Sequence, residues 1–158
     1  MKRAIPTLSL ILLMVQLVNA QGFFDKISKT KWEGSGELLK STASFQMDWR
    51  PILDGKFYEL SFQNQRDESK EYIFRSKGIY RPGGDGNFTG TWFDVRGYSF
   101  SLKGKFTENE LTVCWGNPET EVGKTIYSIK DDGTVSVIDY ILEDGKLIPF
   151  GNALYQKR

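Results

Sequence analysis

The sequence GNFTGTWFDVRGYSFSL, from Gly86 to Leu102, contains two runs of β-branched and aromatic residues separated by Arg96-Gly97. Such runs favour strands, and a glycine between them favours a tight turn, so this stretch predicts two adjacent antiparallel strands. Trp92 and Asp94 are two residues apart and should therefore share one face of the first strand. A large aromatic side chain in phase with a carboxylate is typical of either a ligand site or a structural ion pair.

The same succession of runs and turns continues over most of the chain. Asp54-Gly55, Asp85-Gly86, Asp132-Gly133 and Asp144-Gly145 each separate two runs of strand-forming residues. Asp-Gly is favoured in turns whose two central residues both need a positive φ, the geometry that joins antiparallel strands tightly. We therefore expect a meander of about ten strands. Their expected ranges are about 30–39, 43–52, 56–64, 70–80, 86–95, 97–104, 110–116, 121–130, 133–142 and 146–156.

Alternation of apolar and polar residues indicates how these strands are oriented. Phe45, Met47 and Trp49 alternate with polar residues, and similar alternation occurs within 58–62, 111–115 and 135–141. One face of the sheet should therefore be apolar and the other polar and exposed to solvent. A long sheet of this kind has unpaired edges unless it closes on itself. The sequence predicts an all-β, antiparallel up-and-down meander closed into a barrel with room for a small ligand.

The N-terminal residues have the pattern of a secretory signal peptide. Lys2 and Arg3 precede an apolar run over 8–18, and a small-residue cleavage pattern ends at Ala20. The apolar run is shorter than the roughly 20 residues that cross a bilayer, so we expect cleavage and no membrane span. The expected organisation is a signal peptide over 1–20 and a single barrel domain over 21–158, secreted or periplasmic.

The start of the barrel domain and its charge give two further expectations. Phe23, Phe24 and Ile27 are spaced to share one helical face, which favours a short helix or turn before the first strand. Loss of Lys2 and Arg3 with the signal peptide would change the formal charge from +1 to −1. A nearly neutral chain without a basic run is not expected to bind nucleic acid, and we expect a monomer.

Several chemistries are excluded by composition. The chain has no histidine, which excludes Ser-His-Asp and Cys-His nucleophiles, His-ligated zinc and His-ligated haem. Cys114 is the only cysteine, so no intramolecular disulfide can form, and we expect it to be a small buried strand residue. Gly123-Lys124-Thr125 resembles the end of a phosphate-binding loop, but Pro118 stands where the first glycine is required. We expect no metal and no cofactor.

Polar side chains should gather at one rim of the barrel. Alternate strands of a meander run the same way, so Asp94, Arg96 and Trp115 fall toward one rim, and Glu121 joins them. Asp139 is in phase with the apolar residues of its strand and should point inward. A buried carboxylate costs several kcal/mol unless it is paired, so either a structural network or a ligand has to compensate it. Possible partners are Arg50, Arg75, Arg96, Lys124, Tyr80, Tyr127 and Tyr140.

Four segments resemble the lipocalin-like, calycin-type proteins of bacterial secretomes, many of which carry a domain with no assigned function. They are WEGSGELL at 32–39, GTWFDVRG at 90–97, LTVCWG at 111–116 and FGNALYQKR at 150–158. Lipocalins open with Gly-x-Trp, whereas this chain has the order Trp32-x-Gly34-x-Gly36. The resemblance implies an up-and-down barrel with an interior pocket and no particular ligand.

The main functional hypothesis is a secreted or periplasmic protein that binds a small, largely apolar molecule inside the barrel. One alternative is a hydrolase that uses a carboxylate pair. The other is a structural or interaction module whose barrel is filled by its own side chains. Small barrels of this kind bind more often than they catalyse, so we expect binding rather than an enzyme. The expected ligand-binding residues are Phe45, Met47, Trp49, Trp92, Asp94, Trp115, Glu121, Tyr127 and Asp139.

Overall fold

The computed structural model describes residues 22–69 and 71–158, so the expected signal peptide over 1–20 lies outside the described residues. Within them, a short helix precedes ten strands. The elements are α1 (Gly22–Ile27), β1 (Lys31–Leu38), β2 (Ser41–Ile52), β3 (Phe57–Arg66), the 3-10 helix η1 (Asp67–Ser69), β4 (Phe74–Pro82), β5 (Asn87–Asp94), β6 (Ser99–Phe106), β7 (Glu110–Asn117), β8 (Glu121–Ile129), β9 (Val135–Glu143) and β10 (Lys146–Lys157).

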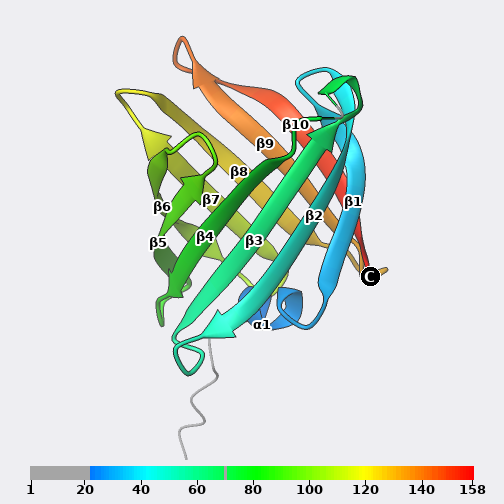
Figure 1. Cartoon of the computed structure of the whole chain (residues 1–158). Helices are drawn as coiled ribbons and strands as arrows, with labels where there is room; N and C mark the ends of the chain where they lie inside the picture. Colours follow the sequence, from blue (N-terminus) through cyan, green and yellow to red (C-terminus); the bar gives the residue numbers. More distant parts are fainter. Residues whose placement is uncertain (1–21, 70) are drawn as a thin grey trace, which may run out of the picture.

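The strands form one closed antiparallel barrel, as the sequence predicts. Each strand pairs with its neighbours in the chain, and β1 pairs with both β2 and β10, which closes the sheet. The β1–β10 pairing runs from Trp32 opposite Lys157 to Leu38 opposite Gly151. Figure 1 shows α1 at one end of the barrel and the β1–β2 and β9–β10 turns at the other, where the interior opens between residues such as Leu39 and Ile148. No described helix is long and apolar enough to cross a membrane.

The hairpin turns differ in part from the geometry expected for Asp-Gly. Asp144 and Gly145 both have positive φ, at 48° and 75°, as predicted. Asp54 and Gly55 also both have positive φ, at 57° and 75°, whereas in the turns at 85–86 and 132–133 only the glycine does. The β1–β2 turn at the open end uses Leu39 and Lys40, with φ of 53° and 67°, although left-handed backbone is costly for such residues.

Helix α1 fills the closed end of the barrel with aromatic side chains. Phe23, Phe24 and Ile27 are completely buried, and the Phe24 ring packs on the rings of Trp49 and Tyr58. The helix is held by hydrogen bonds as well, since the Trp32 indole donates to the Ile27 carbonyl at 2.8 Å. Burial of each such phenylalanine contributes about 1.5–3 kcal/mol, so α1 is an integral part of the core.

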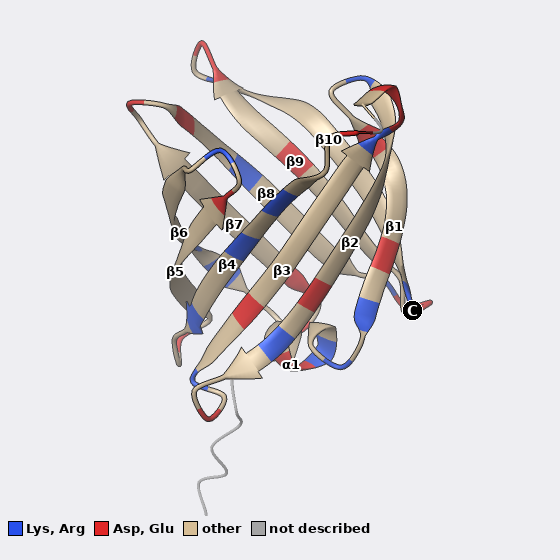
Figure 2. Cartoon of the chain, in the orientation of Figure 1, with Lys and Arg blue, Asp and Glu red and all other residues tan. Residues whose placement is uncertain are grey.

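The two faces of the barrel wall follow the alternation of the strands. Leu111 and Val113 of β7 point inward and are buried, so Cys114, the residue after Val113, points outward and is exposed. The expectation that Cys114 is buried was therefore wrong, because a one-residue step along a strand reverses the face. Figure 2 shows acidic and basic residues scattered over strands and loops, with no extended block of one sign.

Candidate functional site

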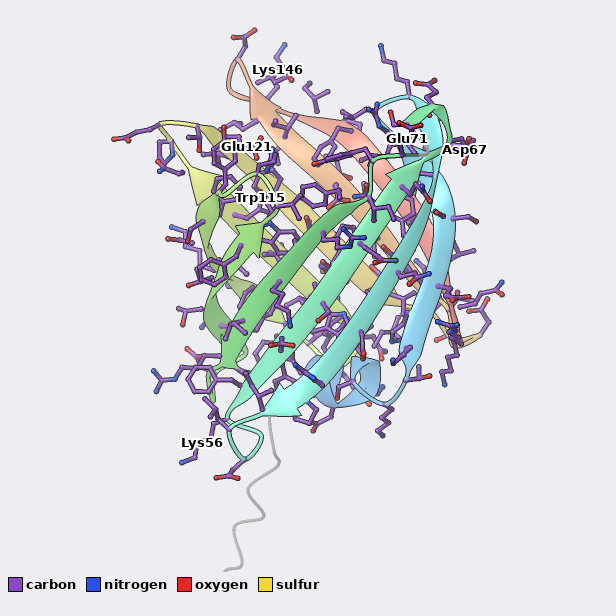
Figure 3. All side chains as sticks on the ribbon, viewed as in Figure 1. Lys56, Asp67, Glu71, Trp115, Glu121 and Lys146 are labelled. Carbon is purple, nitrogen blue, oxygen red and sulfur yellow. The ribbon has the colours of Figure 1, made fainter. Side chains whose placement is uncertain are left out.

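An interior cavity of about 740 Å³ lies between the α1 end of the barrel and its open end. Its volume is in the range of small-molecule sites, about 300–1,000 Å³. Most of its wall is aromatic or aliphatic, and the loops at the open end form its mouth. The aromatic residues of the wall are Phe45, Phe62, Tyr72, Phe74, Tyr80, Trp92, Phe100, Trp115, Tyr127, Phe150 and Tyr155. Figure 3 shows Trp115 and Glu121 toward the open end.

A short chain of hydrogen bonds holds Asp139 in the wall of this cavity. The Trp115 indole Nε1 donates to the Thr125 hydroxyl at 3.1 Å, and that hydroxyl donates to Asp139 Oδ1 at 2.6 Å. Thr125 and Asp139 lie directly opposite each other in the β8–β9 pairing, which brings their side chains to the same inner face. Strand register alone therefore builds this polar group into an otherwise apolar wall.

The indole of Trp115 reaches Thr125 because the residue between them on the inner face has no side chain. A Cβ atom at Gly123 would lie 2.2 Å from Cζ2 of Trp115, well inside the van der Waals distance. Gly123 pairs with Trp115 across β7 and β8, so the large ring lies over the small residue. The Gly123-Lys124-Thr125 segment is therefore a part of the barrel wall. Gly123 and Thr125 lie on its inner face, and Lys124 lies on the outer face between them.

Asp139 is isolated from compensating positive charge. Within residues 22–69 and 71–158, no ion pair involves Asp139, and its Oδ2 atom accepts no hydrogen bond. Burial away from bulk water raises the pKa of Asp139 to about 6, although the Thr125 hydrogen bond acts in the opposite direction. The carboxyl is partly accessible from the cavity itself. The fold therefore maintains a poorly solvated acidic group that faces an open interior.

Three tyrosine hydroxyls lie within the electrostatic reach of Asp139. Burial raises the pKa of Tyr80, Tyr127 and Tyr155, and repulsion from Asp139 raises each of them further. Tyr80 and Tyr127 also influence each other, and the proximity of Tyr80 raises the pKa of Tyr127. All three phenols therefore stay neutral, and Asp139 is the acidic group of the inner cavity.

At the mouth, Arg96 connects two carboxylates from different parts of the chain. Its Nη2 atom lies 2.7 Å from Asp94 Oδ2 and 2.6 Å from Glu121 Oε1. The guanidinium also lies over the Tyr98 ring, 4.8 Å from its centroid. Burial alone would raise the pKa of Asp94, but hydrogen bonds from the Arg96 side chain and backbone outweigh it and hold the pKa below its usual value. This rim cluster ties the β5–β6 turn to the start of β8.

No model of a known protein family matches the chain, and no curated protein gives a significant match. The function of the site therefore has to follow from its own geometry and chemistry. Among the described residues, no group of three or more His, Cys, Asp or Glu side chains is arranged to hold a metal ion.

The structure gathers most of the predicted ligand-binding residues around the cavity. Those that line it are Phe45, Trp92, Trp115, Glu121, Tyr127 and Asp139. Trp49 does not line it, because the aromatic side chains of α1 occupy that end of the barrel, where Trp49 packs on Phe23. Met47 does not line it either, and lies at a second hollow among strands β1 to β5. The Asp94 side chain is 0% exposed and pairs with Arg96, so it supports the rim instead of facing the cavity.

Several wall residues were missed by sequence reasoning, above all Thr125 and Tyr155. Thr125 is in phase with Tyr127 on β8, so the alternation already used for neighbouring strands would have placed it inward. Tyr155 needed the β1–β10 closure, where its ring lies over Gly34. The partner of Asp139 is thus a hydroxyl of the adjacent strand and none of the basic residues that the sequence suggested.

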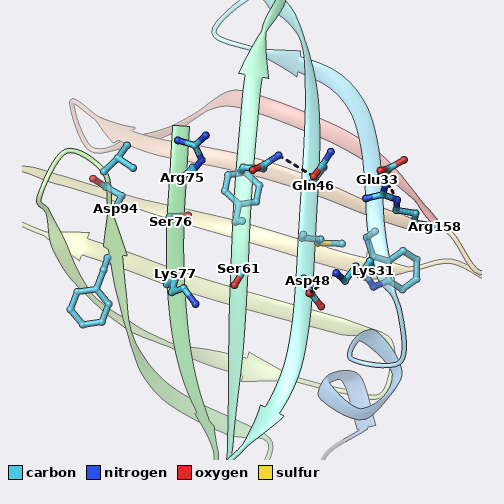
Figure 4. Close-up of a pocket in the computed structure, with 16 residues that line it drawn as sticks. Lys31, Glu33, Gln46, Asp48, Ser61, Arg75, Ser76, Lys77, Asp94 and Arg158 are labelled. Atoms are coloured by element: carbon cyan, nitrogen blue, oxygen red, sulfur yellow. Dashed lines mark hydrogen bonds and ion pairs between the residues drawn. The ribbon is translucent and has the colours of Figure 1, made fainter. Parts of the chain in front are cut away.

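A second hollow, of about 660 Å³, lies against strands β1 to β5 and is surrounded by apolar residues such as Trp32 and Met47 and by many polar and charged residues (Figure 4). Many of these side chains already bond to one another, including the Glu33–Arg158 ion pair at 3.2 Å and the Gln63–Gln46 hydrogen bond at 3.0 Å. Exposed, mutually paired groups of this kind are typical of a solvated outer face. The interior cavity is therefore the better candidate for a binding site.

Proposed function

We propose that this chain is a secreted or periplasmic binding protein that holds a small, largely apolar molecule in the barrel interior. The observation that carries the proposal is the cavity of about 740 Å³ with an aromatic wall, open at one end and closed at the other by α1. The resemblance of four segments to lipocalin-like, calycin-type secreted proteins supports the same conclusion. The signal-peptide pattern over 1–20 supports the location.

The hydrophobic effect is sufficient to drive such binding. Each buried methylene contributes about 0.8 kcal/mol, so about ten of them supply about 8 kcal/mol before the entropic costs of association. This gross gain sets an upper limit on affinity, a dissociation constant near 1 μM, because the costs of association reduce it. A single alkyl chain or a small ring system inside the cavity therefore supplies the main favourable contribution to binding.

The alternatives have less support. A hydrolase would need two carboxylates acting on one substrate, but Asp94 is enclosed and held by Arg96, whereas Asp139 lies in the cavity wall. A module filled by its own side chains would have little interior volume, which is at odds with about 740 Å³.

Occlusion of the cavity tests the proposal. Ile141→Trp would place an indole in the cavity, whereas Leu142→Trp makes the same change one residue along β9, on the exposed face. We expect native mass spectrometry and a solvatochromic dye, excited outside the indole band, to detect binding to the wild type and to Leu142→Trp but not to Ile141→Trp. Absence of binding by the wild type to dyes, fatty alcohols and lipids alike would contradict the proposal, as would equal binding by both variants.

A further inference from the structure

The cavity contains a polar feature that a purely apolar ligand would leave uncompensated. Of the two Asp139 oxygens, Oδ1 accepts the Thr125 hydroxyl at 2.6 Å, whereas Oδ2 has no hydrogen-bond partner among the described residues. Oδ2 points toward Gly151, which has no side chain. A Cβ atom added at Gly151 would lie 3.4 Å from Oδ2, an ordinary van der Waals distance. An apolar ligand placed here would remove the remaining solvent from a carboxylate, which is unfavourable unless the ligand itself supplies a donor.

The surroundings of Asp139 are aromatic and carry no positive charge. Thr125 of β8 contacts it directly, and Trp115 reaches it through Thr125. Tyr80, Tyr127 and Tyr155 line the same cavity and lie within the electrostatic reach of Asp139. Aromatic faces attract cations, most strongly where water is excluded. A carboxylate among electron-rich rings therefore forms a local environment suited to a cation.

The charged residues at the mouth do not change this conclusion. Arg96 is already shared between Asp94 and Glu121, so that cluster has no unused positive charge to offer to Asp139. The other charged residues of the cavity lining are Glu37, Lys40, Arg66 and Glu143, which lie at the strand ends and turns of the open end. None of them forms an ion pair with Asp139 within the described part of the chain.

We propose that the ligand of this cavity carries a basic nitrogen, and that its ammonium group pairs with Asp139 while its apolar part lies against the aromatic wall. The inference rests on the proposed function, because it names the chemical class of the molecule that the barrel holds. An ammonium group brings a full positive charge and up to three donors, so it satisfies both the charge and the open Oδ2 atom. An alcohol supplies a donor without the charge, and a carboxylate ligand is repelled.

The pairing also gives binding a characteristic pH dependence. In the empty cavity the pKa of Asp139 is about 6, and the groups that face it are Thr125 and the neutral Trp115, Tyr80, Tyr127 and Tyr155. Above this pH the carboxylate is ready to accept an ammonium group, whereas below it the ligand has to displace a proton. Amine affinity should therefore fall about tenfold for each pH unit below the pKa, while alcohol affinity should change little.

Three probes of equal chain length test the inference: decylamine, decanol and decanoate, each titrated into the purified protein well above and well below pH 6. At the higher pH we expect decylamine to bind at least about tenfold more tightly than decanol, and decanoate most weakly. Asp139→Asn should abolish the preference for the amine. Asp144→Asn makes the same chemical change in the exposed β9–β10 turn and should retain the preference.

The outcomes separate this inference from the proposed function. If decanol binds as tightly as decylamine at the higher pH, or if Asp139→Asn keeps the amine preference, the amine assignment is wrong while cavity binding stands. If none of the three probes binds the wild type at either pH, both fail together. Calorimetry in buffers of different ionisation heat adds a second readout, since amine binding below the pKa of Asp139 should release a proton.

Discussion

Replacement of Asp139 by asparagine should stabilise the protein at neutral pH, and the size of the gain should depend on pH. The pKa of Asp139 rises from its ordinary 3.8 to about 6 on folding because the carboxyl is buried. Each pKa unit is worth about 1.4 kcal/mol, so keeping this group ionised in the folded state costs up to about 3 kcal/mol. Asparagine removes the charge, keeps the shape and can still accept the Thr125 hydrogen bond.

The sign of the effect follows from proton binding. Below about pH 4 both folded and unfolded chains hold the proton, so the wild type and Asp139→Asn should be about equally stable. Between pH 4 and 6 the unfolded chain loses the proton first, so wild-type stability falls relative to the variant. Above about pH 6 the difference should stay constant.

Urea unfolding of both proteins across this pH range measures the difference directly, because all other carboxylates are common to the two chains. Asp144→Asn provides the matched control and should show no such trend. Destabilisation of Asp139→Asn by several kcal/mol at neutral pH would refute the reasoning, since it would mean that the carboxylate is the structural partner of a cation.

Three further predictions concern other parts of the barrel, each measured by the same unfolding experiment. Phe24→Ala should cost about 3–5 kcal/mol, because it leaves a cavity under the α1 end of the barrel, and a loss below about 1 kcal/mol would show that α1 is dispensable. Arg96→Ala should cost about 1–3 kcal/mol, moderated by the 39% exposure of its side chain, and a smaller amount when Asp94 is already asparagine. Lys40→Gly should stabilise the protein by about 0.5–1 kcal/mol, because glycine relieves a φ of 67°, and a loss of stability would contradict this interpretation of the turn.

The barrel could be predicted from sequence because its signal is local and repeated. Alternation in runs such as 43–52 and 111–115, together with turn residues between runs, determines which face of each strand is apolar. A long meander leaves its first and last strands unpaired at the edges, which favours closure of the sheet. The pairing of β1 with β10 is this expected closure. The short helix was also expected, since Phe23, Phe24 and Ile27 share one face.

The depth of each residue in the barrel could not be predicted in the same way. Alternation identified Met47 and Trp49 as inward but gave no indication that α1 fills the barrel around Trp49. Likewise, Asp94 lies on the expected rim, but only three-dimensional geometry shows that Arg96 encloses it. Which inward residues line a cavity depends on how the ends of a barrel are plugged, and that is a property of tertiary packing.

The partner of Asp139 shows a further limit of sequence reasoning. The expected partners were mainly charged, because a buried carboxylate is usually paired. Thr125 is opposite Asp139 only through the register of β8 and β9, and Trp115 reaches Thr125 only because Gly123 leaves room. Register and the absence of a single side chain thus determine the polar centre of the cavity, and neither has a strong sequence signature.

The central claim is that the barrel interior binds a ligand, and methyl NMR tests it most directly. In protein with labelled Ile, Leu and Val methyl groups, titration with decylamine or decanol, whichever binds more tightly, should shift the inward Val113, Val137 and Ile141. The outward Ile138 and Leu142 of the same β9 strand should not shift. Shifts confined to the outward methyl groups, or no shifts at saturating ligand, would contradict the claim.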